Sequence, residues 1–157
     1  MTTVIDDWSD STIAYLDYQD LLSYQFDLSG EPISLHEDFD LTSIKRSSFM
    51  TYAEQKLWVG YFDKEAAGYL SFYDLDENGL PLENITSDDL EDSKALKTVK
   101  IPEKIQGVAF YKDKIIFSQS YGDTDAHLLV YSNPGLENLT DFTNENRLET
   151  IDAPSYL

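Results

Sequence analysis

The segment IPEKIQGVAFYKDKIIFSQSYGDTDAHLLVY, residues 101–131, decides the fold of this chain. It contains three short apolar runs, which are separated by a polar turn at residues 112–114 and a polar loop at residues 122–125. The runs are rich in Val, Ile, Phe and Tyr, residue types that suit a pleated and packed surface. Helical periodicity is nearly absent, so the pattern predicts three consecutive β-strands.

An earlier copy of this pattern lies 58 residues upstream, in SSFMTYAEQKLWVGYF at residues 47–62 and in the following run that ends at Tyr73. The copies align without a gap, and the matched pairs include Met50 with Val108, Leu57 with Ile115, Trp58 with Ile116, and Tyr73 with Tyr131. With a shorter offset, LENIT at residues 82–86 recurs as LENLT at residues 136–140. A repeat of roughly 50–60 residues indicates a solenoid, a propeller or an array.

The apolar runs carry large side chains on both faces, as KIIF at residues 114–117 and LLVY at residues 128–131 show. A strand with one face in water would alternate between apolar and polar residues instead. The blades of a β-propeller are covered on both faces by their neighbours. The sequence therefore predicts an all-β fold of antiparallel β-propeller-type blades.

The two copies resemble successive blades of a group of bacterial β-propeller proteins over residues 47–133, just over half of the chain. Gln106-Gly107 and SQSYG at residues 118–122 are the most recognisable parts. Proteins of this group are often predicted to be secreted and mostly lack an assigned function. More distantly, they are similar to the gluconolactonase-like and quinoprotein-like propellers. The resemblance implies blades of four antiparallel strands.

On this interpretation the chain forms a single partial propeller domain over residues 1–157. Its parts are a loosely held end at 1–11, a partial blade at 12–46, blades at 47–100 and 101–146, and the start of a further strand at 147–157. Closed propellers use about 4–8 blades, whereas this chain supplies about three. We therefore expect a partial propeller that is not closed, from a truncated frame or an excerpt. Uncovered blade faces would lead to self-association or require a missing partner.

Composition limits the partners and the chemistry. The 157 residues include 30 Asp and Glu but only 11 Lys and Arg, for a net charge of −19, which argues against direct binding to nucleic acid or to an anionic membrane. There is no cysteine, so thiolate metal sites and cysteine nucleophiles are excluded. No signal peptide is visible, which predicts a cytoplasmic protein as written, or a secreted one if the chain is an excerpt of a longer precursor. No cofactor and no metal ligand set is predicted.

Four polar residues are the candidate ligand contacts: Gln106, Ser48, Ser118 and Ser120. Gln106 and Ser48 open strands at matching positions of the repeat, and the first strand of a propeller blade lines the central channel. The two other serines follow a buried run and would end near the same loops. Structural hydrogen bonding between blades is the alternative for all four, and none is predicted to be catalytic.

Two further patterns suggest chemistry only weakly. DLDENG at residues 74–79 matches the first half of a calcium-binding EF-hand loop, but position 12 of that loop is Ile85 instead of glutamate, which favours a hairpin turn. His127 is close in sequence to Asp123, Asp125 and two candidate serines. No G-x-S-x-G elbow accompanies them, which favours a histidine at a blade edge.

These observations predict a non-catalytic propeller segment that serves as a binding or interaction scaffold for an unknown protein or small-molecule ligand. One alternative is a fragment of a propeller hydrolase or lactonase, whose catalytic groups would be shared with other blades. A second alternative is an acidic mimic of nucleic acid, which the high negative charge suggests. Fold alone does not choose among these functions.

Overall fold

The computed structural model describes residues 2–4, 12–15, 36–41, 44, 47–79, 81–82, 92–93, 95–122 and 125–152. Strands dominate these residues, which include no α-helix and one short 3₁₀ helix, η1, at Leu136–Asn138. The prediction of an all-β fold is therefore confirmed. Residues 16–35 of the partial blade predicted at 12–46 lie outside the described residues.

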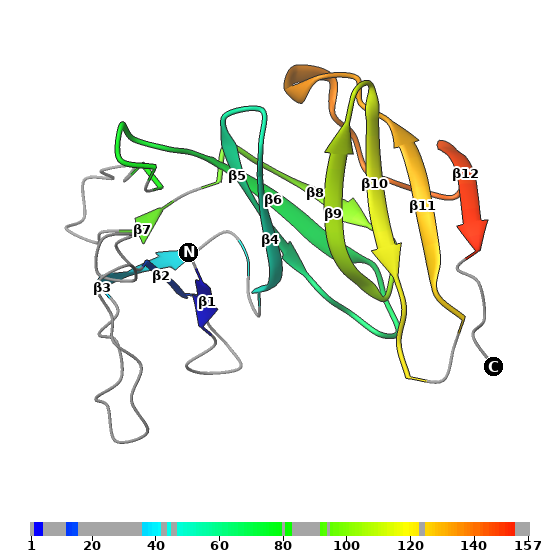
Figure 1. Cartoon of the computed structure of the whole chain (residues 1–157), viewed down its shortest axis with the longest axis horizontal. Coiled ribbons are helices and arrows are strands. Elements are labelled where there is room, and N and C mark those ends of the chain that lie inside the picture. Colours follow the sequence, from blue (N-terminus) through cyan, green and yellow to red (C-terminus); the bar gives the residue numbers. More distant parts are fainter. Residues whose placement is uncertain are drawn as a thin grey trace, which may run out of the picture.

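The strands form three four-stranded sheets (Figure 1). The first sheet has the order β1-β2-β3-β7, with strands Thr2–Val4, Thr12–Tyr15, His36–Leu41 and Asp92–Ser93, and its last pair is parallel. The second has the order β4-β5-β6-β8, with strands Ser47–Ala53, Lys56–Tyr61, Gly68–Asp74 and Lys97–Ile101. The third has the order β9-β10-β11-β12, with strands Ile105–Tyr111, Lys114–Gln119, His127–Ser132 and Arg147–Asp152.

The second and third sheets share one topology, an antiparallel meander of four strands. Strands β4 and β9 begin at residues 47 and 105, and β5 and β10 begin at residues 56 and 114, so both pairs are 58 residues apart. The apolar runs of the sequence thus coincide with the strands. The second and third sheets both begin with a tight hairpin, because only two residues separate their first two strands.

Two strands lie in segments that were expected to be a loosely held end and the start of a further strand. Strand β1 lies within the end that was expected to be loosely held, and its three residues pair with β2. Strand β12 lies in the segment expected to start a further strand, 147–157, and it pairs with β11 as the fourth strand of the third sheet. Five of its six residues are exposed, because an edge strand is held by backbone pairing and does not need an apolar pattern.

The main core lies between the second and third sheets. Trp58 is fully buried there, and the centroid of its ring system is 4.7 Å from the ring centroids of Phe72 on β6 and of Phe110 on β9. The indole Nε1 donates a hydrogen bond to the carbonyl oxygen of Ala53 at 3.0 Å. Ile115 and Phe117 of β10 are also fully buried in this core. Both sheets therefore contribute one apolar face to a shared interior.

The connection from β11 to β12 packs over the outer strand of the second sheet. Phe142 is only 6% exposed, and the centroid of its ring lies 5.0 Å from the ring centroids of both Phe117 and Tyr131. Its backbone nitrogen donates to the carbonyl oxygen of Lys100 at 2.9 Å, and the Lys100 nitrogen donates to Asp141 Oδ1 at 2.9 Å. The connection thus satisfies part of the edge of β8 and protects it from pairing with another chain.

The second sheet is buried on both faces. Leu57, Val59 and Tyr73 form a second cluster on the face away from the third sheet, together with Leu41 and Ile44. In the third sheet, by contrast, Leu128 of β11 is 40% exposed on the face away from the core. Of these two sheets, the second fits the prediction of strands apolar on both faces better than the third.

The hydroxyl of Tyr131 leads to a prediction about alkaline pH. This hydroxyl is buried and has no hydrogen-bond partner among the residues that the structure describes. Burial raises the pKa of the Tyr131 phenol, and the Arg147 guanidinium partly opposes this shift. Because a free phenol ionises near pH 10, the unfolded chain loses this proton before the folded chain does. Stability from this group is complete below about pH 10 and falls as the pH rises further.

We therefore expect Tyr131→Phe to reduce the loss of stability above about pH 10 and to change the free energy of unfolding by less than about 1 kcal/mol at pH 7. Urea unfolding of both proteins at pH 7, 9, 10 and 11 provides the measurement. Parallel pH profiles for the two proteins would show that the phenol ionises with the same pKa in both states.

Candidate binding site

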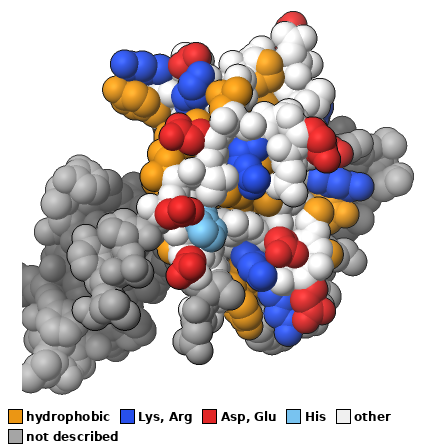
Figure 2. Space-filling view, turned by 90° about the vertical axis from the view of Figure 1, so that its right-hand side faces the viewer, with side chains coloured by type: hydrophobic (Ala, Val, Ile, Leu, Met, Phe, Trp, Pro, Cys, Tyr) orange, Lys and Arg blue, Asp and Glu red, His pale blue; other side chains and the backbone are white. Residues whose placement is uncertain are grey.

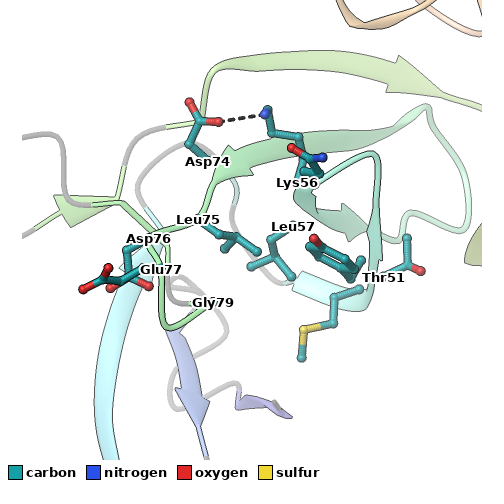
Figure 3. A pocket seen from close by; sticks show the side chains of 11 residues that line it. Thr51, Lys56, Leu57, Asp74, Leu75, Asp76, Glu77 and Gly79 are labelled. Atoms are coloured by element: carbon teal, nitrogen blue, oxygen red, sulfur yellow. Dashed lines mark ion pairs between the residues drawn. The ribbon is translucent and has the colours of Figure 1, made fainter.

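An open cavity of about 770 Å³ lies at the β4–β5 hairpin end of the second sheet (Figure 3). This volume is in the range of small-molecule sites. Strands β4, β5 and β6 and the segment after β6 all contribute to its wall. The lining residues are Met50, Thr51, Tyr52, Gln55, Lys56, Leu57, Asp74, Leu75, Asp76, Glu77 and Gly79.

The hairpin shapes one wall of the cavity. Its two turn residues, Glu54 and Gln55, have φ angles of 52° and 58°, which are the left-handed conformations of a type I′ turn. This tight turn pairs Lys56 of β5 with Ala53 of β4, and on its other side Lys56 pairs with Asp74 of β6. The Lys56 ammonium therefore lies 2.9 Å from Asp74 Oδ1 and forms an ion pair across the two strands.

The segment DLDENG forms the opposite wall as a tight turn. The carboxylate of Asp76 accepts a hydrogen bond from the backbone nitrogen of Asn78 at 2.8 Å, and Gly79 N donates to the Asp76 carbonyl oxygen at 3.1 Å. Gly79 has a φ of 81°, which a residue with a side chain rarely adopts. A bridge between Leu75 and Pro81 closes the turn. The interpretation of this motif as a turn is therefore correct.

The cavity combines an apolar floor with a negatively charged rim. Leu57 is 3% exposed, and its side chain and that of Leu75 point toward one another in Figure 3. Tyr52 is 65% exposed at the rim. The lining includes three carboxylates but only one ammonium group, that of Lys56, which is already paired. Such a site suits a ligand with an apolar body and a positive charge.

The four residues predicted from the sequence lie outside this cavity. Gln106 Nε2 donates to the carbonyl oxygen of Ser120 at 3.0 Å, so the fold brings these two residues together. Ser48 Oγ accepts a hydrogen bond from the backbone nitrogen of Phe62 at 3.2 Å. Ser118 pairs with Gly107 in the ladder between β9 and β10. The hydrogen bonds from Gln106 to Ser120 and from Phe62 to Ser48 each connect a strand to a loop.

His127 has a different partner from those that its sequence neighbours suggested. Its Nδ1 lies 2.9 Å from Asp152 Oδ1, across the pair formed by β11 and β12. The Asp152 side chain is 81% exposed, whereas a catalytic histidine–carboxylate pair is usually shielded from water. Within the described ranges, no group of three or more Asp, Glu, His or Cys residues is placed to hold a metal ion.

Comparison with known proteins yields no relative: no family model, no curated protein and no solved structure matches this chain. Among the residues that the structure describes, no helix is long and apolar enough to cross a membrane.

The sequence reasoning missed the cavity because its residues lie in different strands. Lys56 and Asp74 are separated by a whole hairpin, and only the register of β5 and β6 brings them together. One signal was available. Tyr52 and Lys56 flank a short turn, and DLDENG follows the third strand of the same unit. In a meander, the first turn and the end of the third strand lie at the same end of the sheet.

Proposed function

We propose that this chain is a non-catalytic binding scaffold made of β-propeller-type blades, and that it binds a cationic ligand with an apolar body in the cavity at the β4–β5 hairpin. The observation that carries the proposal is the cavity itself, with its floor of Leu57 and Leu75 and its excess of carboxylates. A peptide that contains arginine and leucine side chains has both required properties.

Two features support the propeller arrangement. The second and third sheets are consecutive four-stranded meanders, the topology of propeller blades. Their first strands, β4 and β9, contact one another, as the inner strands of adjacent blades do. The stacking also repeats. Leu57 of the second sheet faces away from the third sheet. Its equivalent, Ile115 of the third sheet, faces the second sheet. Each of these two sheets therefore turns the same side toward the sheet that comes before it in the chain.

The chemistry of the rim supports a cationic ligand. Asp74 is paired with Lys56, and both oxygens of the Asp76 carboxylate accept hydrogen bonds from Asn78, one from its backbone nitrogen and one from its side-chain amide. Glu77 is exposed. An incoming guanidinium could pair with the Glu77 carboxylate while an adjacent leucine contacts the apolar floor. The face of the Tyr52 ring offers a second attraction for a cation.

The test is a binding isotherm with a capped fluorescent peptide of alternating arginine and leucine. We expect Tyr52→Ala to raise the dissociation constant about two- to fivefold, because a cation over an exposed aromatic ring is worth about 0.5–1 kcal/mol. Glu77→Gln should raise it about two- to fivefold, as for an exposed ion pair. Fluorescence anisotropy at two salt concentrations measures both effects.

Glu137→Gln is the matched control, because Glu137 is an exposed glutamate that follows the third strand of the next sheet as Glu77 follows β6. It removes the same charge from the molecule without touching the cavity. Equal losses of affinity for the Glu77 and Glu137 variants would mean that the peptide responds only to net charge, and would reject the proposed site.

A further inference from the structure

The third sheet has a second face, opposite to the core, with an apolar strip that is partly exposed on β11 and β12. The ladder pairs Ile116 with Val130 and pairs Leu128 with Ile151, and paired residues share a face of the sheet. Leu128 is 40% exposed and Ile151 is 44% exposed, whereas Val130 is only 8% exposed. We call this face, with its strip of Ile116, Leu128, Val130 and Ile151, the outer face.

The outer face corresponds to a face that is covered elsewhere in the same molecule. Ile116, Leu128 and Val130 are each 58 residues after Trp58, Leu70 and Phe72 respectively. Those three residues of the second sheet are at most 4% exposed, because the third sheet packs on them. The outer face therefore repeats the position of an existing interface between sheets, with smaller side chains.

The charges on this face are arranged so that two copies of it complement each other. Lys114 of β10 pairs with Tyr111 and Ser132 at the hairpin end of the face, and its ammonium forms an exposed ion pair with Asp113 at 2.8 Å that Glu149 of a second copy would have to join or replace. Glu149 lies opposite Val130 on β12, at the other side of the apolar strip. The side of the molecule that carries β12 shows apolar side chains between charged groups of both signs (Figure 2). A two-fold axis along the strands would place the β10 side of one copy over the β12 side of the other.

We infer that a second copy of this chain packs its outer face on the outer face of the first, so that the protein forms an isologous dimer. The apolar strip lies at the centre of this interface, and Lys114 of each copy lies near Glu149 of the other. This inference does not rest on the ligand cavity, and it joins two like faces, whereas the stacking within the chain joins unlike ones. Closed two-fold dimers are the commonest soluble assemblies.

The test is sedimentation-equilibrium centrifugation of the full chain over a wide concentration range. We expect Leu128→Asp to raise the dimer dissociation constant about a hundredfold or more, because each dimer would bury two carboxylates. Leu82→Asp is the matched control, since Leu82 is 45% exposed in the segment that follows the second sheet's third strand. It should leave the dimer unchanged. Far-ultraviolet circular dichroism confirms that both variants remain folded.

Charge exchange tests the orientation of the two copies. Lys114→Glu and Glu149→Lys should each raise the dissociation constant about five- to tenfold, because each contact occurs twice in the dimer. The double variant should restore association. A wild-type protein that remains monomeric at every concentration, a dimer that Leu128→Asp does not weaken, or a double variant that is weaker than both single variants would overturn the inference. Peptide binding by the monomeric Leu128→Asp variant tests the cavity independently.

Discussion

Replacement of Trp58 by alanine should lower the free energy of unfolding by about 3–5 kcal/mol. The indole is fully buried between the second and third sheets and contacts the rings of Phe72 and Phe110. Its truncation would leave a cavity at the centre of the core. It would also remove the hydrogen bond that the indole Nε1 donates to the carbonyl oxygen of Ala53. Guanidinium unfolding followed by circular dichroism, at one protein concentration, measures the loss.

The control for this prediction is Tyr52→Ala, six residues before Trp58. The Tyr52 side chain is 65% exposed, so its removal should change stability by less than about 1 kcal/mol. If the Trp58 variant unfolded at the same denaturant concentration as the wild type, the burial of the indole between two sheets would be contradicted.

Phe142→Ala should be nearly as severe, with a loss of about 3–5 kcal/mol, although Phe142 belongs to no strand. Its ring packs edge-on against Phe117 and Tyr131, and its backbone nitrogen bonds to Lys100. Loss of the ring would both open the core and release the segment that covers the edge of β8. Thermal and chemical unfolding of the variant measure the effect.

Leu148→Ala serves as the comparison, because Leu148 is a similarly large apolar residue but is 54% exposed on β12. We expect its substitution to cost less than about 1 kcal/mol. Similar small losses for the Phe142 and Leu148 variants would show that the connection between β11 and β12 does not close the core.

The strands of the second and third sheets could be predicted because their side chains repeat. Leu57 and Ile115 occupy equivalent strands, and both are buried, so the apolar pattern and the packing agree. Phe142 could not be predicted in the same way. It is a single aromatic residue among polar ones, and its burial depends on contacts with β8, β10 and β11 that no local pattern records.

The edge strands β12 and β1 were harder to predict from the sequence for a related reason. Strand β12 is held by backbone pairs to β11, and Leu148 and Ile151 remain exposed, so its sequence carries little hydrophobic signal. Strand β1 has only three residues, Thr2–Val4, which is too short for a period-2 pattern to stand out. Both strands are held by backbone pairing, and the pattern of apolar and polar side chains gives little indication of that pairing.

The candidate site depends even more on tertiary register. The sequence reasoning favoured polar residues near recognisable strand ends, such as Gln106 and Ser120, and these two do meet. The cavity instead requires the ion pair of Lys56 and Asp74 and the turn at Gly79 to lie at one end of a sheet. Residues far apart in sequence acquire this relation only when the meander folds.

Chemical-shift mapping of the peptide complex is the most direct test of the proposed binding site. Amide spectra of the ¹⁵N-labelled chain should be recorded while the arginine–leucine peptide is added. We expect shifts centred on the cavity, at residues 50–57 and 74–79. Shifts confined to the opposite end, around Gln106 and Ser120, or uniformly small shifts over the whole acidic surface, would contradict a ligand site at the β4–β5 hairpin.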